Sequence, residues 1–208
     1  VEYRRWRAGE VWQLGPFTLT DPYRTVVDIA RTTAFRYALG YVDGLAREYS
    51  VEREELRAYA QANCRGLHGI ARAFDVFEHM DGRSDNGGES EARAAMILAG
   101  VAAPELQVEI TRPGNAGYYL ADYGWQMPNG SWILAELHGL GKFEDDVQND
   151  PEHTAAKTYR AALMRDANLR AMGHNVIHFK LSDTYDVKAF GSMMRGYGVP
   201  TTKPYADS

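Results

Sequence analysis

The chain has 208 residues, of which 45% are hydrophobic and 25% charged, and these are the proportions of a globular protein. A single cysteine, Cys64, excludes an internal disulfide framework and a zinc site built from several cysteines. The net charge of −5 disfavours non-specific binding of nucleic acid by the whole surface, so a nucleic-acid partner has to contact a local basic face.

The hydropathy of the chain gives no indication of a membrane partner. The longest run of low polarity, residues 94–104, is too short to cross a bilayer, and the chain does not open on a basic and apolar leader. We therefore expect a soluble, cytoplasmic protein. Because the first residue is Val1 rather than Met, we also expect a further segment upstream of it.

The first part of the chain, residues 1–83, is predicted to be mainly helical. Asp21-Pro22 is a start signal, because Asp is a preferred cap and Pro suits the first helical turn. Apolar residues then recur at helical spacing as far as Tyr41, and Gly40 and Gly44 are expected to interrupt or end these turns.

Two further helices are expected before a linker. Ser50 is a candidate N-cap for a helix that reaches about Asn63, and another helix is expected over residues 67–80. Residues 81–88 combine three glycines with polar side chains, a composition that predicts a linker.

Residues 84–208 are predicted to form an α/β domain with a mixed β-sheet flanked by helices. Alternating apolar residues predict the strands, and the long apolar-polar pattern after residue 150 predicts a helix. The expected elements are a helix over 89–99, strands over 106–110, 118–125 and 132–137, a helix over 152–172, a strand over 175–180, and a last helix capped by Asp183 and ending near Arg195.

Two acids are placed by the expected hairpin between the second and third strands. Pro128-Asn129-Gly130 fits a three-residue loop, which makes Met127 face Ser131. In this register Asp122 lies directly opposite Glu136, with Cβ atoms roughly 4.5–5.5 Å apart. Like charges at this distance repel, so the pair indicates a cation between them, and hard divalent ions prefer carboxylate oxygens.

An alternative for this pair is that both acids face solvent and repel weakly through water. The alternation of the strands instead gives Glu136 the same face as Trp132 and Leu134, and gives Asp122 that of Leu120. An acid among such neighbours is expected to be paired, protonated or metal-bound.

Residues spread over the second half of the chain together resemble the PD-(D/E)xK restriction-endonuclease-like superfamily, in the branch with very-short-patch-repair-like endonuclease domains. The resemblance covers about residues 84–197. The residues that carry it are Glu89-Ser90, Pro104-Glu105-Leu106-Gln107, Asp122, Glu136-Leu137-His138-Gly139, Lys142-Phe143 and the helix-Gly-strand pattern from Arg165 through Gly173 to Phe179. Upstream, residues 24–31 are similar to the central region of actinobacterial AbiEi-type antitoxins or regulators, whose winged helix would lie before Val1.

This resemblance implies a restriction-endonuclease-like fold and hydrolysis of DNA phosphodiester bonds with Mg²⁺ or Mn²⁺. It implies that Glu89, Asp122 and Glu136 hold the ion, and that Lys142 or His138 assists at the phosphate. The lysine of the family motif falls at His138, and a neutral imidazole does not replace a permanent ammonium. A catalytically silent DNA-binding antitoxin or regulator, or an interaction scaffold that merely inherits the acids, is therefore the competing expectation.

Several other residues are weaker candidates, each with an ordinary structural role as the alternative. Four basic residues of the long helix are candidates for contact with a DNA backbone, although their spacing forms no single helical stripe and a solvated face is the default. Glu91 competes with Glu89, and a half-buried Gln107 is expected to bond a neighbour. The basic residues are Lys157, Arg160, Arg165 and Arg170; the remaining candidates are Asp145, Asp146, His153, His174 and His178, of which His178 is expected to be a satisfied strand histidine.

Overall fold

The structure, a computed structural model, describes residues 11–138 and 151–205 of the chain. The chain separates into two compact units, an N-terminal unit that ends at Ser90 and a sheet unit that begins at Glu91. No helix within the described ranges is long and apolar enough to cross a membrane.

The N-terminal unit begins with a β-hairpin that the helical expectation for residues 1–83 missed. Strands β1 (Val11–Leu14) and β2 (Phe17–Thr20) pair antiparallel across Gly15-Pro16. Gly15 has a φ of 59°, which glycine adopts without steric cost, and this permits the two-residue turn.

Four helices follow the hairpin: α1 (Pro22–Thr32), α2 (Phe35–Tyr49), α3 (Arg53–Asn63) and α4 (Ile70–Phe77). The hydrophobic spacing predicts three helical segments here, and the structure divides the first of them into α1 and α2. The predicted start at Asp21-Pro22 is confirmed, because the Asp21 carboxylate accepts hydrogen bonds from the backbone N–H groups of Tyr23 at 2.7 Å and Arg24 at 3.2 Å. These bonds satisfy two N–H groups that the first turn leaves unpaired.

Two predictions about α2 and α3 are wrong. Gly40 and Gly44 lie inside α2 and do not end it, because the buried side chains of Phe35, Leu39 and Val42 give the helix a continuous apolar face. Ser50 is not the N-cap of α3 but the C-cap of α2, in a left-handed conformation. Polar cap residues occur at both helix ends, so composition alone does not assign the end.

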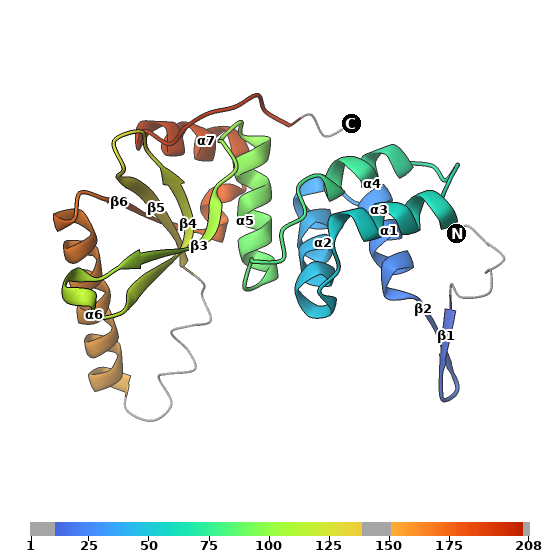
Figure 1. The fold of residues 1–208 in the computed structure, drawn as a ribbon, viewed down its shortest axis with the longest axis horizontal. Helices are drawn as coiled ribbons and strands as arrows, with labels where there is room; N and C mark the ends of the chain where they lie inside the picture. The colour runs from blue at the N-terminus through green and yellow to red at the C-terminus, as the bar shows by residue number, and fades with distance from the viewer. Residues whose placement is uncertain (1–10, 139–150, 206–208) are drawn as a thin grey trace. The chain divides into compact units, whose positions relative to one another are not determined.

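The sheet unit has four strands in the order β3 (Glu105–Thr111), β4 (Tyr118–Gln126), β5 (Trp132–His138) and β6 (Asn175–Lys180), as Figure 1 shows. β3, β4 and β5 pair antiparallel, whereas β5 and β6 pair parallel, with α6 (Pro151–Ala171) as the crossover. The expectation of an α/β domain with a mixed sheet flanked by helices is confirmed. The other elements of the unit are α5 (Gly87–Leu98), which begins before the boundary at Ser90, η1 (Pro113–Asn115), η3 (Leu181–Thr184) and α7 (Val187–Gly196).

Apolar side chains cover both faces of this sheet. On one face Met96 of α5 and Phe190 of α7 pack in a buried cluster with Tyr123 and Phe179. On the other face Leu169 of α6 packs with a second cluster of strand residues. Figure 1 shows α6 on the opposite side of the sheet from α5 and α7.

The expected cap of the last helix is wrong by three residues. Asp186, and not Asp183, accepts a hydrogen bond from the N–H of Ala189 at 2.9 Å and begins α7. Asp183 instead accepts from the N–H of Lys180 at 2.8 Å within the short helix η3.

Candidate functional site

The hairpin between β4 and β5 has the predicted loop and register. The N–H of Met127 donates to the carbonyl of Ser131 at 2.8 Å, and Gly130 closes the loop with a φ of 83°. The ladder pairs Gln126 with Trp132 and continues to Tyr123 opposite Ala135. This is the register that places Asp122 next to Glu136 at the end of the ladder.

Asp122 lies where the pairing of β4 with β5 ends. Its carboxylate Oδ2 accepts a hydrogen bond from the backbone N–H of Leu137 at 2.8 Å. The bond fixes the Asp122 carboxylate against the backbone of β5, at the residue that follows Glu136.

β3 has a local kink opposite the part of β4 that contains Asp122. Gln107, between the two β3 residues that pair with Tyr123 and Ala121, has a φ of 53°, an uncommon value for a residue with a side chain. Its neighbours Leu106 and Val108 belong to the two different cores, although strict alternation predicts one shared face. The half-buried Gln107 therefore marks the point where the β3–β4 ribbon changes its packing.

Glu136 is ion-paired with an arginine of α6. The Nη2 of Arg165 donates to Glu136 Oε1 and also to the backbone carbonyl of Leu120 on β4. Burial raises the pKa of the Glu136 carboxyl, and the negative charge of Asp122 raises it further, while Arg165 lowers it. The pKa of Glu136 remains above its ordinary value, so one guanidinium does not fully compensate for burial beside a second acid.

Two histidines and a buried aspartate lie next to the acids. The rings of His138 and His178 stack with centroids 4.8 Å apart and planes inclined by 20°. His178 Nε2 lies 2.6 Å from Asp166 Oδ2, and Arg170 lies 3.6 Å from the same oxygen. Burial lowers the pKa of His138, and the neighbouring charge of His178 lowers it further. His138 is therefore a neutral imidazole near pH 7.

The structure brings together three of the residues predicted for metal binding or catalysis, Asp122, Glu136 and His138. Glu89 belongs to the N-terminal unit, where its buried carboxylate accepts from the Asp85 N–H and the Asn86 amide, both at 2.8 Å. In residues 11–138 and 151–205 no group of three or more His, Cys, Asp and Glu side chains is arranged to hold a metal ion. The two acids of β4 and β5 are thus the part of the expected metal site that the structure assembles.

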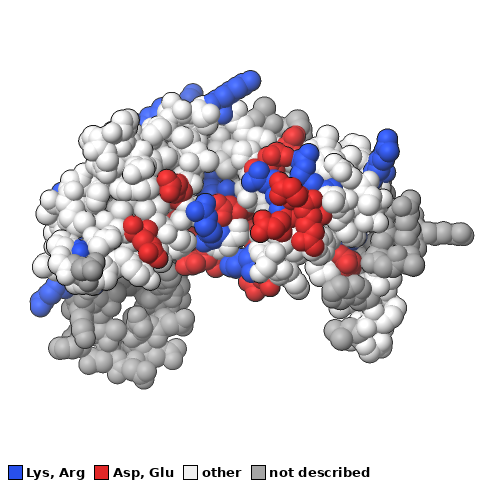
Figure 2. Space-filling model, in the orientation of Figure 1, with Lys and Arg blue, Asp and Glu red and all other residues white. Residues whose placement is uncertain are grey.

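Further predicted candidates either lie outside the described residues or are basic residues of α6. Lys142, Asp145 and Asp146 lie outside the described residues. Arg160 is exposed on α6, whereas Arg165 and Arg170 are ion-paired with Glu136 and Asp166; Lys157 also lies on α6. Among the described residues on the face that Figure 2 shows, acidic and basic side chains are interspersed.

Sequence reasoning missed the contacts that α6 makes with the sheet. Asp166 is not among the predicted candidates, yet it is buried and pairs with His178. The sequence gives only a weak indication of this contact. Its prediction requires the parallel pairing of Glu136 with His178, which depends on how the crossover helix α6 packs on the sheet. The expectation that His178 is a satisfied strand histidine is confirmed by this contact.

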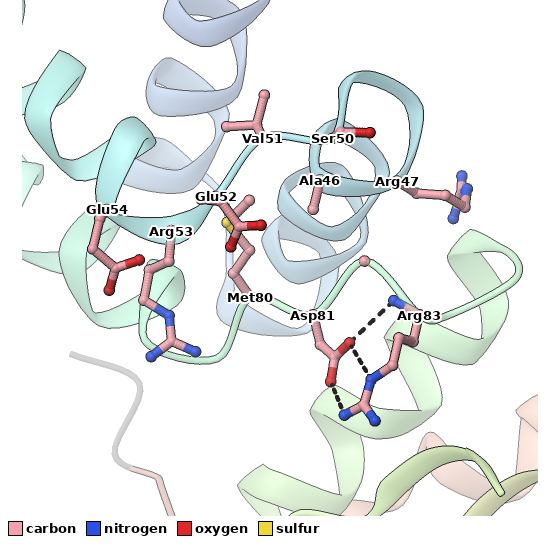
Figure 3. Close-up of a pocket in the computed structure, with 11 residues that line it drawn as sticks. Ala46, Arg47, Ser50, Val51, Glu52, Arg53, Glu54, Met80, Asp81 and Arg83 are labelled. Atoms are coloured by element: carbon pink, nitrogen blue, oxygen red, sulfur yellow. Dashed lines mark hydrogen bonds and ion pairs between the residues drawn. The ribbon is translucent and has the colours of Figure 1, made fainter.

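A separate pocket of about 680 Å³ lies in the N-terminal unit, between the end of α2, residues 50–54 and residues 80–83 (Figure 3). Arg83 donates to Asp81 through Nε at 3.0 Å and Nη2 at 2.8 Å, and Arg53 lies 3.6 Å from Glu78. The charges around this pocket therefore compensate one another, and none of the predicted site residues lines it.

Two curated proteins from two strains of Mycobacterium tuberculosis are similar to this chain: uncharacterized protein Rv2248 and uncharacterized protein MT2308. Each is 36% identical over 106 residues, which is 51% of this chain and 38% of the relative. The matched segment therefore spans well under half of either relative, and their names state no activity. No family model and no solved structure matches the chain.

Proposed function

We propose that the sheet unit has a restriction-endonuclease-like fold and hydrolyses DNA phosphodiester bonds with Mg²⁺ or Mn²⁺, with Asp122 and Glu136 as the acids that hold the ion. The observation that carries this proposal is the two-acid site, defined as the carboxylates of Asp122 and Glu136 at the end of the β4–β5 ladder. Burial is the largest cause of the raised pKa of Glu136, and the charge of Asp122 adds a smaller contribution.

The donor set of this site is compatible with magnesium. Mg²⁺ is commonly held by one or two carboxylates, with waters and substrate phosphates as the other ligands. The ion would polarise the phosphate and stabilise the charge that develops there. The protein contributes the orientation of the acids, which the Leu137 N–H fixes for Asp122.

The proposal predicts that cleavage depends on the charge of Asp122. In Asp122→Asn the side-chain oxygen still accepts from the Leu137 N–H, but the negative charge is gone, so we expect cleavage to fall by about 100-fold or more. The measurement is the nicking rate of supercoiled plasmid with Mg²⁺ or Mn²⁺, against an EDTA blank.

Glu109→Gln is the matched control, because Glu109 is an exposed acid on the neighbouring strand β3. It is expected to cleave at the rate of the unmodified protein. An Asp122→Asn protein that cleaves at the unmodified rate would exclude the two-acid site as the source of activity.

A second candidate is a DNA-binding antitoxin or regulator with a silent nuclease fold. It is supported by the neutral His138 at the position of the motif lysine and by the Arg165 guanidinium that already pairs with Glu136. This candidate predicts that a fluorescent duplex binds in EDTA, with affinity that falls as salt rises, and is not cut when Mg²⁺ or Mn²⁺ is added. Binding that persists with unchanged affinity in high salt would contradict a phosphate-contacting role.

A further inference from the structure

The guanidinium of Arg165 occupies the side of the two-acid site that faces α6. Its Nη2 is shared between Glu136 on β5 and the carbonyl of Leu120 on β4, so it bridges the two strands that carry the acids. The pair is largely shielded from solvent, with 25% of the Arg165 side chain and 14% of the Glu136 side chain exposed. Arg165 is therefore a part of the site and not one of the solvated charges of α6.

A half-buried carboxylate requires a counter-charge, and in this structure the guanidinium supplies it. A divalent ion on Glu136 would supply the same compensation through the same carboxylate. Two cations at neighbouring positions repel strongly where water is largely excluded, so one of them has to withdraw. Arg165 is attached by a long flexible side chain, whereas a metal ion needs the fixed oxygens, so the guanidinium is the group that moves.

We infer that Arg165 is a built-in counter-cation of the two-acid site. A divalent metal ion has to displace the Arg165 guanidinium from Glu136, and this competition weakens metal binding. This inference rests on the proposed function, because it takes Asp122 and Glu136 as the residues that hold the ion. The displaced guanidinium stays tethered to α6 close to the ion. Its planar fork of N–H donors is suited to phosphate oxygens, so metal binding makes Arg165 available to a DNA phosphate.

The test is a calorimetric titration of the full chain with Mn²⁺ alone. Arg165→Gln removes the charge and keeps a polar, although shorter, side chain at this position, and it is expected to bind Mn²⁺ about tenfold more tightly than the unmodified protein. Arg160→Ala is the matched control, because it removes one positive charge from an exposed position on the same helix. It is expected to change the Mn²⁺ affinity by less than about twofold.

The possible outcomes separate this inference from the proposed function. If the unmodified protein binds Mn²⁺ and Arg165→Gln binds it no more tightly, the counter-cation role is wrong and the metal site stands. If neither protein binds millimolar Mn²⁺, both ideas are wrong. Binding by Arg165→Gln alone supports the inference, and its loss in Arg165→Gln/Asp122→Asn locates the ion. Circular dichroism checks that each variant is folded. If Arg165→Gln is unfolded, Arg165→Lys is titrated instead. The lysine side chain is shorter and pairs more weakly with Glu136, so this variant is expected to bind Mn²⁺ more tightly than the unmodified protein.

Discussion

A histidine ring hydrogen-bonds the first residue of β5. The Nδ1 of His174 accepts a hydrogen bond from the backbone N–H of Trp132 at 3.1 Å, and burial lowers the pKa of His174. Because a protonated Nδ1 has no lone pair to offer, this bond exists only with the neutral ring. His174 was a candidate site residue in the sequence, and the structure gives it a structural role next to the loop that carries the chain into β6.

This bond predicts a pH-dependent contribution to stability. The unfolded chain, with the ordinary histidine pKa of about 6.5, takes up the proton more readily than the folded protein. The contribution of His174 is therefore complete above that pH and is lost as the pH falls below it. In His174→Asn the amide oxygen still accepts from Trp132 but does not titrate, so the unmodified protein should lose about 1 kcal/mol more than the variant between pH 7.5 and 5.

Urea unfolding followed by circular dichroism across this pH range measures the difference. His68→Asn is the control, since His68 is exposed in the N-terminal unit. Parallel stability curves for the unmodified protein and His174→Asn would contradict the assignment.

Among the elements, strands and hairpin of the sheet unit were predictable because their signals are local. Residues 175–180 form β6 with the bounds that the sequence predicts, and the loop Pro128-Asn129-Gly130 sets the register of β4 and β5. The β1–β2 hairpin was missed because each strand has only four residues on either side of Gly15-Pro16, which is too short for an alternation of apolar and polar residues to be recognised. The kink at Gln107 has no local signal, because a positive φ in a residue other than glycine is imposed by the surrounding packing.

The sequence predicted the part of the candidate site that lies within the β4–β5 hairpin, and it did not predict the contacts with α6. Asp122 and Glu136 come together through local register, so the sequence sufficed for them. The ion pair with Arg165 and the contact of Asp166 with His178 depend on the docking of α6, which side-chain spacing along a single helix does not determine. The resemblance to nucleases named the acids but did not indicate that an arginine pairs with one of them.

At the centre of the sheet, Gly124 of β4 permits close packing of three side chains. A Cβ atom at this position would lie 2.9 Å from Val108, 3.0 Å from Trp132 and 3.3 Å from Leu134. We expect Gly124→Ala to destabilise the sheet unit by about 1–3 kcal/mol, because these neighbours are confined in a dense core. Urea unfolding monitored by tryptophan fluorescence measures the change.

Gly196→Ala is the matched control for this substitution. Gly196 lies at the end of α7 with open space around its Cα, so alanine should be neutral or slightly stabilising. Equal stability of Gly124→Ala and the unmodified protein would show that the sheet relaxes around the added methyl group.

For the whole molecule, the division into two units implies separate cores. The two apolar clusters on the faces of the sheet consist of residues after Glu91, whereas the single cysteine, Cys64, is buried in the N-terminal unit. A reagent that reacts with the Cys64 thiol therefore reports the opening of the N-terminal unit.

We expect the Cys64 thiol to react about 1,000-fold more slowly in the native protein than in urea-unfolded protein, because reaction requires local or global unfolding. Gly124→Ala should lower the stability of the sheet unit and leave this protection unchanged. Labelling kinetics with a chromogenic disulfide reagent test both statements. Loss of Cys64 protection in Gly124→Ala would indicate that the two units unfold as one.

The parallel pairing of β5 with β6 has a consequence for biosynthesis. Trp132 and His174 meet across 42 positions, and the crossover helix α6 lies between them in the chain. Such long-range contacts slow folding, because the chain loses the entropy of a large loop before any contact compensates. On the ribosome, Glu136 therefore emerges well before its parallel partner strand, and its carboxylate is hydrated until α6 and β6 have been translated.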